Sequence, residues 1–192
     1  MGDDLGAGAR EVHAQAAAIL AFWFEELPPE KRFARDDAVD AECAGRFGDV
    51  RDVILASYAV GWRDAADTLL AAIIALDQFS RNIHRDSARA FEGDALALSL
   101  SRAAIARGWD EGLDVQRRQF LYMPFMHAED AGVQAESVAL FASLGDAEIL
   151  AFAQGHRALI DRFGRFPHRN AALERASTAE EIAYLKPPGA GY

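Results

Sequence analysis

The stretch AADTLLAAIIALDQFSRN, residues 65–82, decides the fold. Its first twelve residues are apolar apart from Asp67 and Thr68, and the run stops at Asp77. A membrane-spanning helix needs about 20 apolar residues, so this shorter run predicts a helix buried inside a protein core. Asp64, directly before the run, suits the N-cap of a helix over residues 65–82.

The rest of the chain also carries its apolar residues at helical spacing. No segment shows sustained alternation of apolar and polar residues, so the sequence predicts no strand and an all-α fold of about eight or nine helices. Arms of 15–18 residues recur, which is typical of antiparallel helix pairs stacked side by side. The other predicted helices cover residues 10–27, 36–47, 49–60, 90–107, 115–130, 132–144, 147–163 and 168–175, with a capping-box start at 177–181.

Glycine and proline mark the predicted boundaries. Gly48 should separate two short helices, and Pro124 should kink or break the helix over 115–130. Gly164 should end its helix with positive φ. With 192 residues, a single domain over 10–186 is expected, between a mobile tail at 1–9 and a loose tail at 187–192.

The bulk composition excludes some classes of partner. The formal net charge is −10, which disfavours binding to nucleic acid or to acidic membrane surfaces. Cys43 is the only cysteine, so no internal disulfide forms, and the acidic N-terminus shows no signal peptide. These features predict a cytoplasmic protein and leave its oligomeric state open.

Three short motifs concentrate the scarce polar residue types. The first polar motif is DQFSRNIHR (77–85), the second is PFMHAED (124–130), and the third is FGRFPHRN (163–170). Both asparagines of the chain follow an arginine in these motifs, and four of the five histidines lie in them or nearby. This concentration predicts one polar site assembled from distant segments.

In the first polar motif, residues four apart share a helix face. Asp77 can therefore pair with Arg81, and Gln78 with Asn82. We interpret the Asp77–Arg81 pair as structural. Asn82 has two interpretations that stay open here: it contacts a ligand, or it bonds loose carbonyls at a helix end.

In the second polar motif, His127 and Asp130 are three residues apart and should face together, whereas Glu129 should point elsewhere. A histidine beside carboxylates indicates an acid–base pair or metal ligands. The spacing fits no compact metal motif, so no metal is predicted. The alternative is a neutral histidine, satisfied by hydrogen bonds, near the kink at Pro124.

The third polar motif follows a helix that should turn His156 inward. Beyond Gly164, a rigid turn presents two arginines, a histidine and an amide, together with backbone N–H groups. This combination suits an anion such as a carboxylate, phosphate or sulfate. Alternatively, Arg165 and Arg169 lock the turn through ion pairs to acidic helices.

Over nearly its whole length, the chain resembles a family of bacterial proteins called domain of unknown function 924. The resemblance implies an all-helical fold similar to tetratricopeptide (TPR) repeats, and it implies no reaction. The motifs that carry it are Phe22-Trp23-Phe24; Phe33, Asp36, Asp40 and Arg46-Phe47; Leu76-Asp77-Gln78-Phe79 with Arg81-Asn82; Phe91, Asp94 and Ala97; Phe120-Leu121-Tyr122-Met123-Pro124 with His127 and Glu129-Asp130; Gln134; His156, Ile160 and Phe163 through Asn170; and Ser177-Thr178 with Glu180-Glu181.

Two positions depart from that family's pattern. Ser80 stands where the family usually has proline, and Ala128 where it usually has serine. The missing hydroxyl argues against a nucleophilic serine at position 128.

Two functions of different class follow. The first is a site for a small anionic ligand between helices, with the question of enzymatic activity and of any cofactor left open. The second is a TPR-like peptide-binding or scaffold protein whose motifs act as structural networks. For the first, the candidate acid–base (catalytic) residues are His127, Glu129 and His156, and the candidate ligand-binding residues are Gln78, Arg81, Asn82, Arg165, His168, Arg169 and Asn170.

Overall fold

All regular structure in the described part of the chain, residues 2–186 of the computed structural model, is helical. This confirms the all-α class and the expected number of helices. The α-helices are α1 (Gly2–Ala21), α2 (Asp37–Ala56), α3 (Ala66–Ile74), α4 (Ser80–Ile83), α5 (Asp94–Ala106), α6 (Val115–Met126), α7 (Ala131–Ala142), α8 (Ala147–Phe163) and α9 (Ala179–Leu185). Two π-turns, η1 (Phe22–Glu26) and η3 (Ala75–Phe79), and three 3₁₀ turns, η2 (Pro29–Lys31), η4 (Ala88–Phe91) and η5 (Pro167–Arg169), lie between them.

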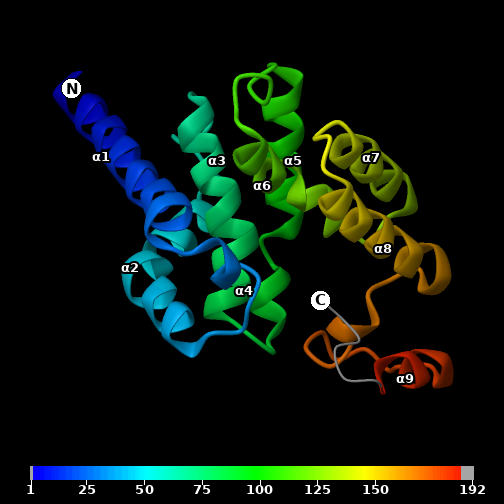
Figure 1. The fold of residues 1–192 in the computed structure, drawn as a ribbon. Coiled ribbons are helices and arrows are strands. Elements are labelled where there is room, and N and C mark those ends of the chain that lie inside the picture. The colour runs from blue at the N-terminus through cyan, green and yellow to red at the C-terminus, as the bar shows by residue number, and fades with distance from the viewer. Residues whose placement is uncertain (1, 187–192) are drawn as a thin grey trace.

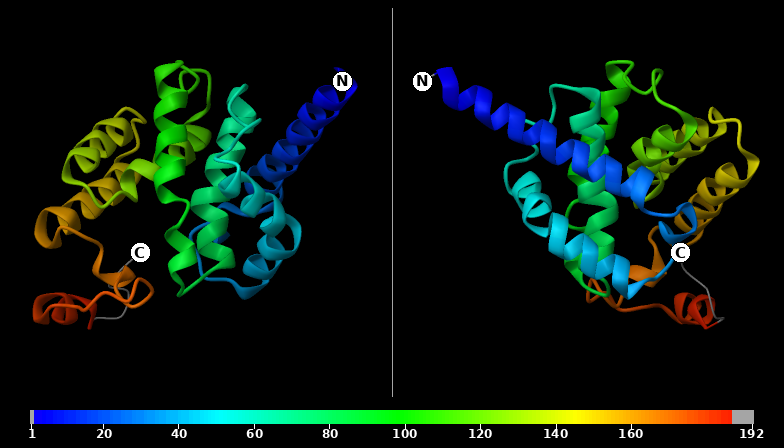
Figure 2. Two further views of the ribbon diagram at one scale, coloured as in Figure 1. Left: turned by 180° about the vertical axis from the view of Figure 1, so that it is seen from behind. Right: turned by 60° about the vertical axis from the view of Figure 1, so that its left-hand side comes forward.

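Helix α3 occupies the middle of the molecule (Figure 1). It packs against α1, α5 and α6, while α2 covers the continuation of its run in η3 and α4. The α7–α8 hairpin packs onto α6. The segment after α8 leads to α9 at one end of the molecule, away from α1 (Figures 1 and 2).

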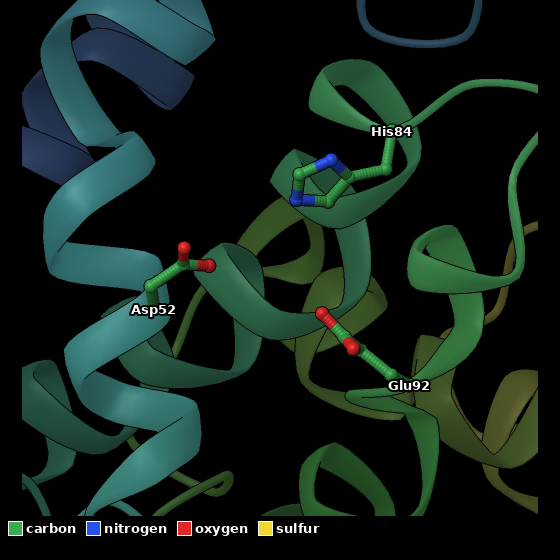
Figure 3. A group of neighbouring side chains, drawn as sticks. All are labelled: Asp52, His84 and Glu92. Carbon is green, nitrogen blue, oxygen red and sulfur yellow. The ribbon is translucent and has the colours of Figure 1, made fainter.

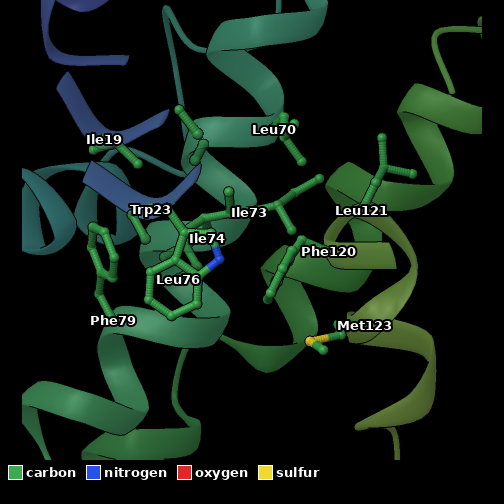
Figure 4. Close-up of a cluster of buried hydrophobic side chains, with 14 of the residues drawn as sticks. Ile19, Trp23, Leu70, Ile73, Ile74, Leu76, Phe79, Phe120, Leu121 and Met123 are labelled. Carbon is green, nitrogen blue, oxygen red and sulfur yellow. The ribbon is translucent and has the colours of Figure 1, made fainter. Parts of the chain in front are cut away.

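The apolar run singled out in the sequence forms the centre of the core. Every residue from Leu69 to Leu76 is fully buried. Trp23, Phe79 and Phe120 close over this run (Figure 4), with the Trp23 ring edge-on to both phenylalanines at centroid distances of 5.6 and 5.4 Å. Edge-to-face pairs of this kind add to the free energy gained from burial.

The predicted helix over 65–82 is present, but it contains a wider turn. Helix α3 passes directly into the π-turn η3, which passes directly into α4. A π-turn holds one extra residue per turn and so rotates all later side chains relative to a regular helix. The first polar motif begins inside this turn.

Three predicted boundaries were wrong. Residues 36–60 contain one helix, α2, rather than two, because Gly48 sits where a Cβ would meet nothing and a helical glycine costs only about 1 kcal/mol. Helix α1 begins at Gly2 rather than near residue 10, since extending a formed helix is cheap. Helix α6 ends at Met126 rather than at residue 130, and Pro124 lies within it without breaking it in two.

Gly164 has a φ of 70°, as expected for a glycine that ends a helix. The loose tail predicted over 187–192 lies outside the described residues. Among residues 2–186, no helix combines the length and the apolar character needed to cross a membrane.

Candidate functional site

Asp77 is the buried centre of the first polar motif. Its side chain is 1% exposed inside the π-turn, and its Oδ1 lies 2.7 Å from Nδ1 of His127 and 3.2 Å from Nη1 of Arg81. Gln78 donates to Oδ2 over 2.6 Å. Burial alone would raise the pKa of Asp77, but Arg81 and His127 together hold it well below its ordinary range, so Asp77 is a carboxylate.

This carboxylate fixes the state of His127. Burial lowers the pKa of His127, and Asp77 offsets only part of that effect, so the imidazole is neutral at pH 7. A neutral ring beside a carboxylate carries its proton on the nitrogen that faces it, here Nδ1. Nε2 then keeps its lone pair, the side chain is 14% exposed, and within residues 2–186 no group hydrogen-bonds to Nε2.

Asp94, the first residue of α5, joins two arginines of different motifs. Arg81 donates to both of its oxygens, over 3.0 and 3.1 Å, and Arg169 donates to Oδ2 over 3.1 Å. Arg169 also donates to the carbonyl oxygen of His127 over 3.0 Å. A continuous chain of charges therefore connects Asp77 to the third polar motif.

The guanidinium of Arg169 is held between two aromatic rings. Its carbon lies 4.6 Å from the ring centroid of Phe91 and 4.7 Å from that of Phe166. Its Nε is buried without a hydrogen-bond partner among the described residues, as is Nδ1 of His168. Burial and the charge of Arg81 lower the pKa of Arg169 to about 10, which shows that its positive charge is incompletely compensated.

Two more histidines lie beside His127. The rings of His127 and His156 are 6.1 Å apart, and Phe166 contacts the rings of both His156 and His168. His156 donates from Nδ1 to the carbonyl of Phe152. Burial, followed by neighbouring histidines and arginines, lowers the pKa of His156 to about 3 and that of His168 to about 4, so both are neutral at pH 7.

The carboxylate of Glu129 is taken up by contacts that hold the third polar motif in place. Arg175 donates to its two oxygens over 2.6 and 2.9 Å, and the backbone N–H of Phe166 donates to Oε1 over 2.7 Å. With its oxygens so occupied, Glu129 fixes the third polar motif against the end of α6. The structure thus gives no support to an acid–base role for Glu129.

Several predicted residues lie outside this cluster. Asn82 donates to Asp40, which also binds Arg85. Arg165 donates to both oxygens of the buried Glu181, and Asn170 bonds Ser177 and Arg175.

Of the predicted side-chain pairs, Asp77–Arg81 forms. The Gln78–Asn82 and His127–Asp130 pairs do not. Gln78 instead bonds Asp77 and Asn82 bonds Asp40, while Asp130 caps α7.

The structure thus gathers Gln78, Arg81, His127, His156, His168 and Arg169. Asp77 and Asp94 complete the cluster. Sequence reasoning did not select Asp94 as a site residue, and it interpreted the Asp77–Arg81 pair as structural. Asp94 did appear in the family-like pattern with Phe91. A carboxylate in a shared pattern, far from any partner in sequence, was the available signal.

A separate group of described side chains is close enough together to share a metal ion. Ligand atoms of Asp52, His84 and Glu92 all lie within 4.8 Å of one another, apart from the site around His127.

Comparison with known proteins identifies the family of this chain. A family model described as "Bacterial protein of unknown function (DUF924)" matches residues 19–189. The chain belongs to this family. All three polar motifs and Asp94 fall inside the matched range.

A solved structure extends the agreement to the fold. The chain is similar to a structure titled "Structure of Protein of Unknown Function ATU0120 from Agrobacterium tumefaciens", with 39% identity and a TM-score of 0.86. The alignment covers 91% of this chain and 98% of that one, so the DUF924 protein described here has that all-helical fold over nearly its full length. A search of curated proteins gave no match.

Proposed function

We propose that this DUF924 protein binds a small anionic ligand and moves a proton on it, with His127 as general base. The observation that carries the proposal is the 2.7 Å contact between Asp77 Oδ1 and His127 Nδ1, which directs the lone pair of Nε2 away from the carboxylate. A carboxylate that orients a neutral imidazole is a recurring arrangement for proton abstraction.

The neighbouring residues support an anionic ligand. Arg169 is buried, has an unpartnered Nε, and carries a charge that burial and Arg81 destabilise. An anion beside it would supply the missing compensation and accept the free N–H. His168, whose Nδ1 is also unpartnered among the described residues, lies next to it in the turn.

The residues around His127 also limit the groups that could give it a proton. Ala128 follows His127, so position 128 offers no hydroxyl nucleophile. We therefore infer that the proton comes from the ligand itself or from water. Asp77 would act as a positioning residue, because it contacts Nδ1 of the imidazole, whereas Nε2 would take the proton.

A structural role for the motifs is the competing interpretation. It is favoured by the partners that Asn82, Arg165 and Asn170 already have in the protein. We also place the protein in the cytoplasm, since its single cysteine, Cys43, is a buried free thiol.

The binding part is tested with inorganic phosphate and acetate as probes, by calorimetric titration and thermal shift. Arg169→Gln should abolish the stabilisation that the probes give to the wild-type protein. Arg165→Gln is the matched control, because it also removes an arginine from an ion pair to a carboxylate, that of Glu181, outside the cluster. Equal probe binding in the wild type and Arg169→Gln would refute an anion site at Arg169.

The proton-transfer part is tested by nitrogen NMR of the histidine side chains at pH 7. We expect His127 to carry its proton on Nδ1, and Asp77→Asn to shift the proton toward Nε2. A wild-type His127 protonated on Nε2 would rule out the base role, whatever the probes do.

A further inference from the structure

A second cluster of ligand-type side chains lies apart from the His127 site. Asp52 comes from the middle of α2, His84 directly follows α4, and Glu92 directly follows η4. Figure 3 shows the imidazole of His84 over the gap between the two carboxylates, which point into that gap from opposite sides. One ligand atom of each residue lies within 4.8 Å of the other two.

His84 distinguishes this group from a cluster of exposed carboxylates alone. Its Nε2 is buried, yet no described residue forms a hydrogen bond with it. A buried polar atom without a partner costs free energy, so an unsatisfied imidazole nitrogen aimed between two carboxylates indicates a missing ligand. Burial, Arg89 and Arg51 also lower the pKa of His84, so the ring is in the neutral form that binds metals.

Arg51 holds the two carboxylates in place. It is fully buried, and its Nη1 lies 2.7 Å from Asp52 Oδ1 and 2.6 Å from Glu92 Oε1. Its other nitrogens donate to Ser80 Oγ and to the backbone carbonyl of Arg89. Such outer contacts orient metal-binding carboxylates in many proteins, and each carboxylate keeps an oxygen that Arg51 does not use.

Arg89 contacts the same two carboxylates at longer distances than Arg51 does. Its side chain is about half exposed, and it contacts Asp52 at 3.3 Å and Glu92 at 3.5 Å. These lengths exceed those of strong charge-assisted bonds. Because the Arg89 backbone is held by Arg51, its side chain can leave for solvent without moving the chain.

We propose that Asp52, His84 and Glu92 bind a divalent transition-metal ion of the Zn²⁺ type, in competition with the Arg89 side chain. One imidazole nitrogen and two carboxylate oxygens form a three-ligand set that Zn²⁺ accepts, with a fourth position left for water.

Tetrahedral Zn²⁺ ligands stand about 3.3 Å apart, so the partly exposed carboxylates would close in on a bound ion. The side chains of Asp52 and Glu92 are 53% and 35% exposed, which gives an ion access to them from solvent.

The test uses the full chain without a histidine tag, titrated with Co²⁺ at pH 7.5 and followed by visible absorption, then displaced with Zn²⁺. We expect one Co²⁺ per chain. His84→Gln should weaken binding by roughly ten-fold or more and should fold normally, because the described side chain of His84 makes no hydrogen bond. His13→Gln, at an exposed histidine of α1, is the control and should bind like the wild type.

Arg89→Gln gives the sharper prediction. Removing the competing cation should tighten Co²⁺ binding about ten-fold, whereas an adventitious surface site would not respond. The proposal fails if the wild type binds no Co²⁺, if His84→Gln binds as tightly as the wild type, or if Arg89→Gln binds more weakly. Loss of the Co²⁺ spectrum in His127→Gln with retention in His84→Gln would also overturn it and would move the metal to the other site.

Discussion

Two partly buried histidines of this protein differ in the partner of one ring nitrogen. His127 has a carboxylate on Nδ1, which fixes its tautomer, whereas His84 has a buried Nε2 that no described residue contacts. Under the two proposals above, the first arrangement would suit a base and the second a metal ligand. The same residue type therefore supports different chemistry according to the next side chain in space.

Asp77→Asn should destabilise the protein by about 3 kcal/mol, because it leaves Arg81 and His127 without their buried partner. The free energy of unfolding from urea titration measures this effect. Asp67→Asn is the matched control: Asp67 is 68% exposed and lies 3.7 Å from Arg117, so its loss should cost less than about 0.5 kcal/mol. Equal costs for the two variants would show that Asp77 is not a structural centre.

At the scale of elements, one close approach places Asp94 between its two arginines. A Cβ on Gly93 would lie 2.8 Å from the carbonyl oxygen of Leu76 and 3.2 Å from the Leu76 Cβ. Only glycine lets the start of α5 come this near to the π-turn. Asp94, the next residue, thereby reaches both Arg81 and Arg169.

Gly93→Ala should therefore destabilise the protein by about 2 kcal/mol, because backbone atoms of the π-turn have to move. Gly48→Ala is the control within α2, where a Cβ meets nothing; it should stabilise the protein by about 0.5–1 kcal/mol. Both values come from chemical denaturation. A Gly93→Ala variant as stable as the wild type would mean that the two elements are not in tight contact.

At this scale, the sequence predicted the features that depend on residues within one helix or at its ends. The buried run of α3, the positive φ of Gly164 and the capping box at Thr178 and Glu181 all follow local rules. The π-turn could not be predicted, since its residues also suit a regular helix. The Asp94 bridge depends on tertiary approach, which local patterns do not encode.

The same limit applies to the candidate site. Its histidines and arginines stood out because such residues are scarce and clustered in the chain. Their partners did not stand out, because carboxylates are abundant in a chain with 30 Asp and Glu residues. Only the fold shows that Asp77 is buried beside His127, that Asp94 joins Arg81 to Arg169, and that Glu129 pairs with Arg175.

For the whole molecule, the buried histidines make stability depend on pH. The pKa values of His156 and His168 fall from 6.5 in the unfolded chain to about 3 and about 4 in the fold. Above pH 6.5 the two histidines are unprotonated in both the folded and the unfolded chain, so they do not lower the free energy of unfolding. As pH falls below 6.5, only the unfolded chain takes up protons, so folding becomes weaker by about 1.4 kcal/mol per pH unit for each histidine.

Denaturation at pH 7, 6 and 5 should show this decline, in a window above the pKa values of ordinary carboxyl groups. His168→Gln should flatten the slope between pH 6 and 5 by about 1.4 kcal/mol per unit. His13→Gln, at an exposed position, should keep the wild-type slope. A wild-type stability that stays constant down to pH 5 would contradict burial of these neutral rings.

The π-turn at Ala75–Phe79 also affects which insertions and deletions this part of the chain can accept. Because a π-turn accommodates one residue more than a regular turn, deleting one residue there would leave an ordinary helix and keep the later residues on their present faces. Arg81 and Ser80 would then still point toward Asp94 and Arg51. Adding a further residue would instead turn the later residues by about 100° around the axis and separate both polar centres, so this segment should accept a deletion more readily than an insertion.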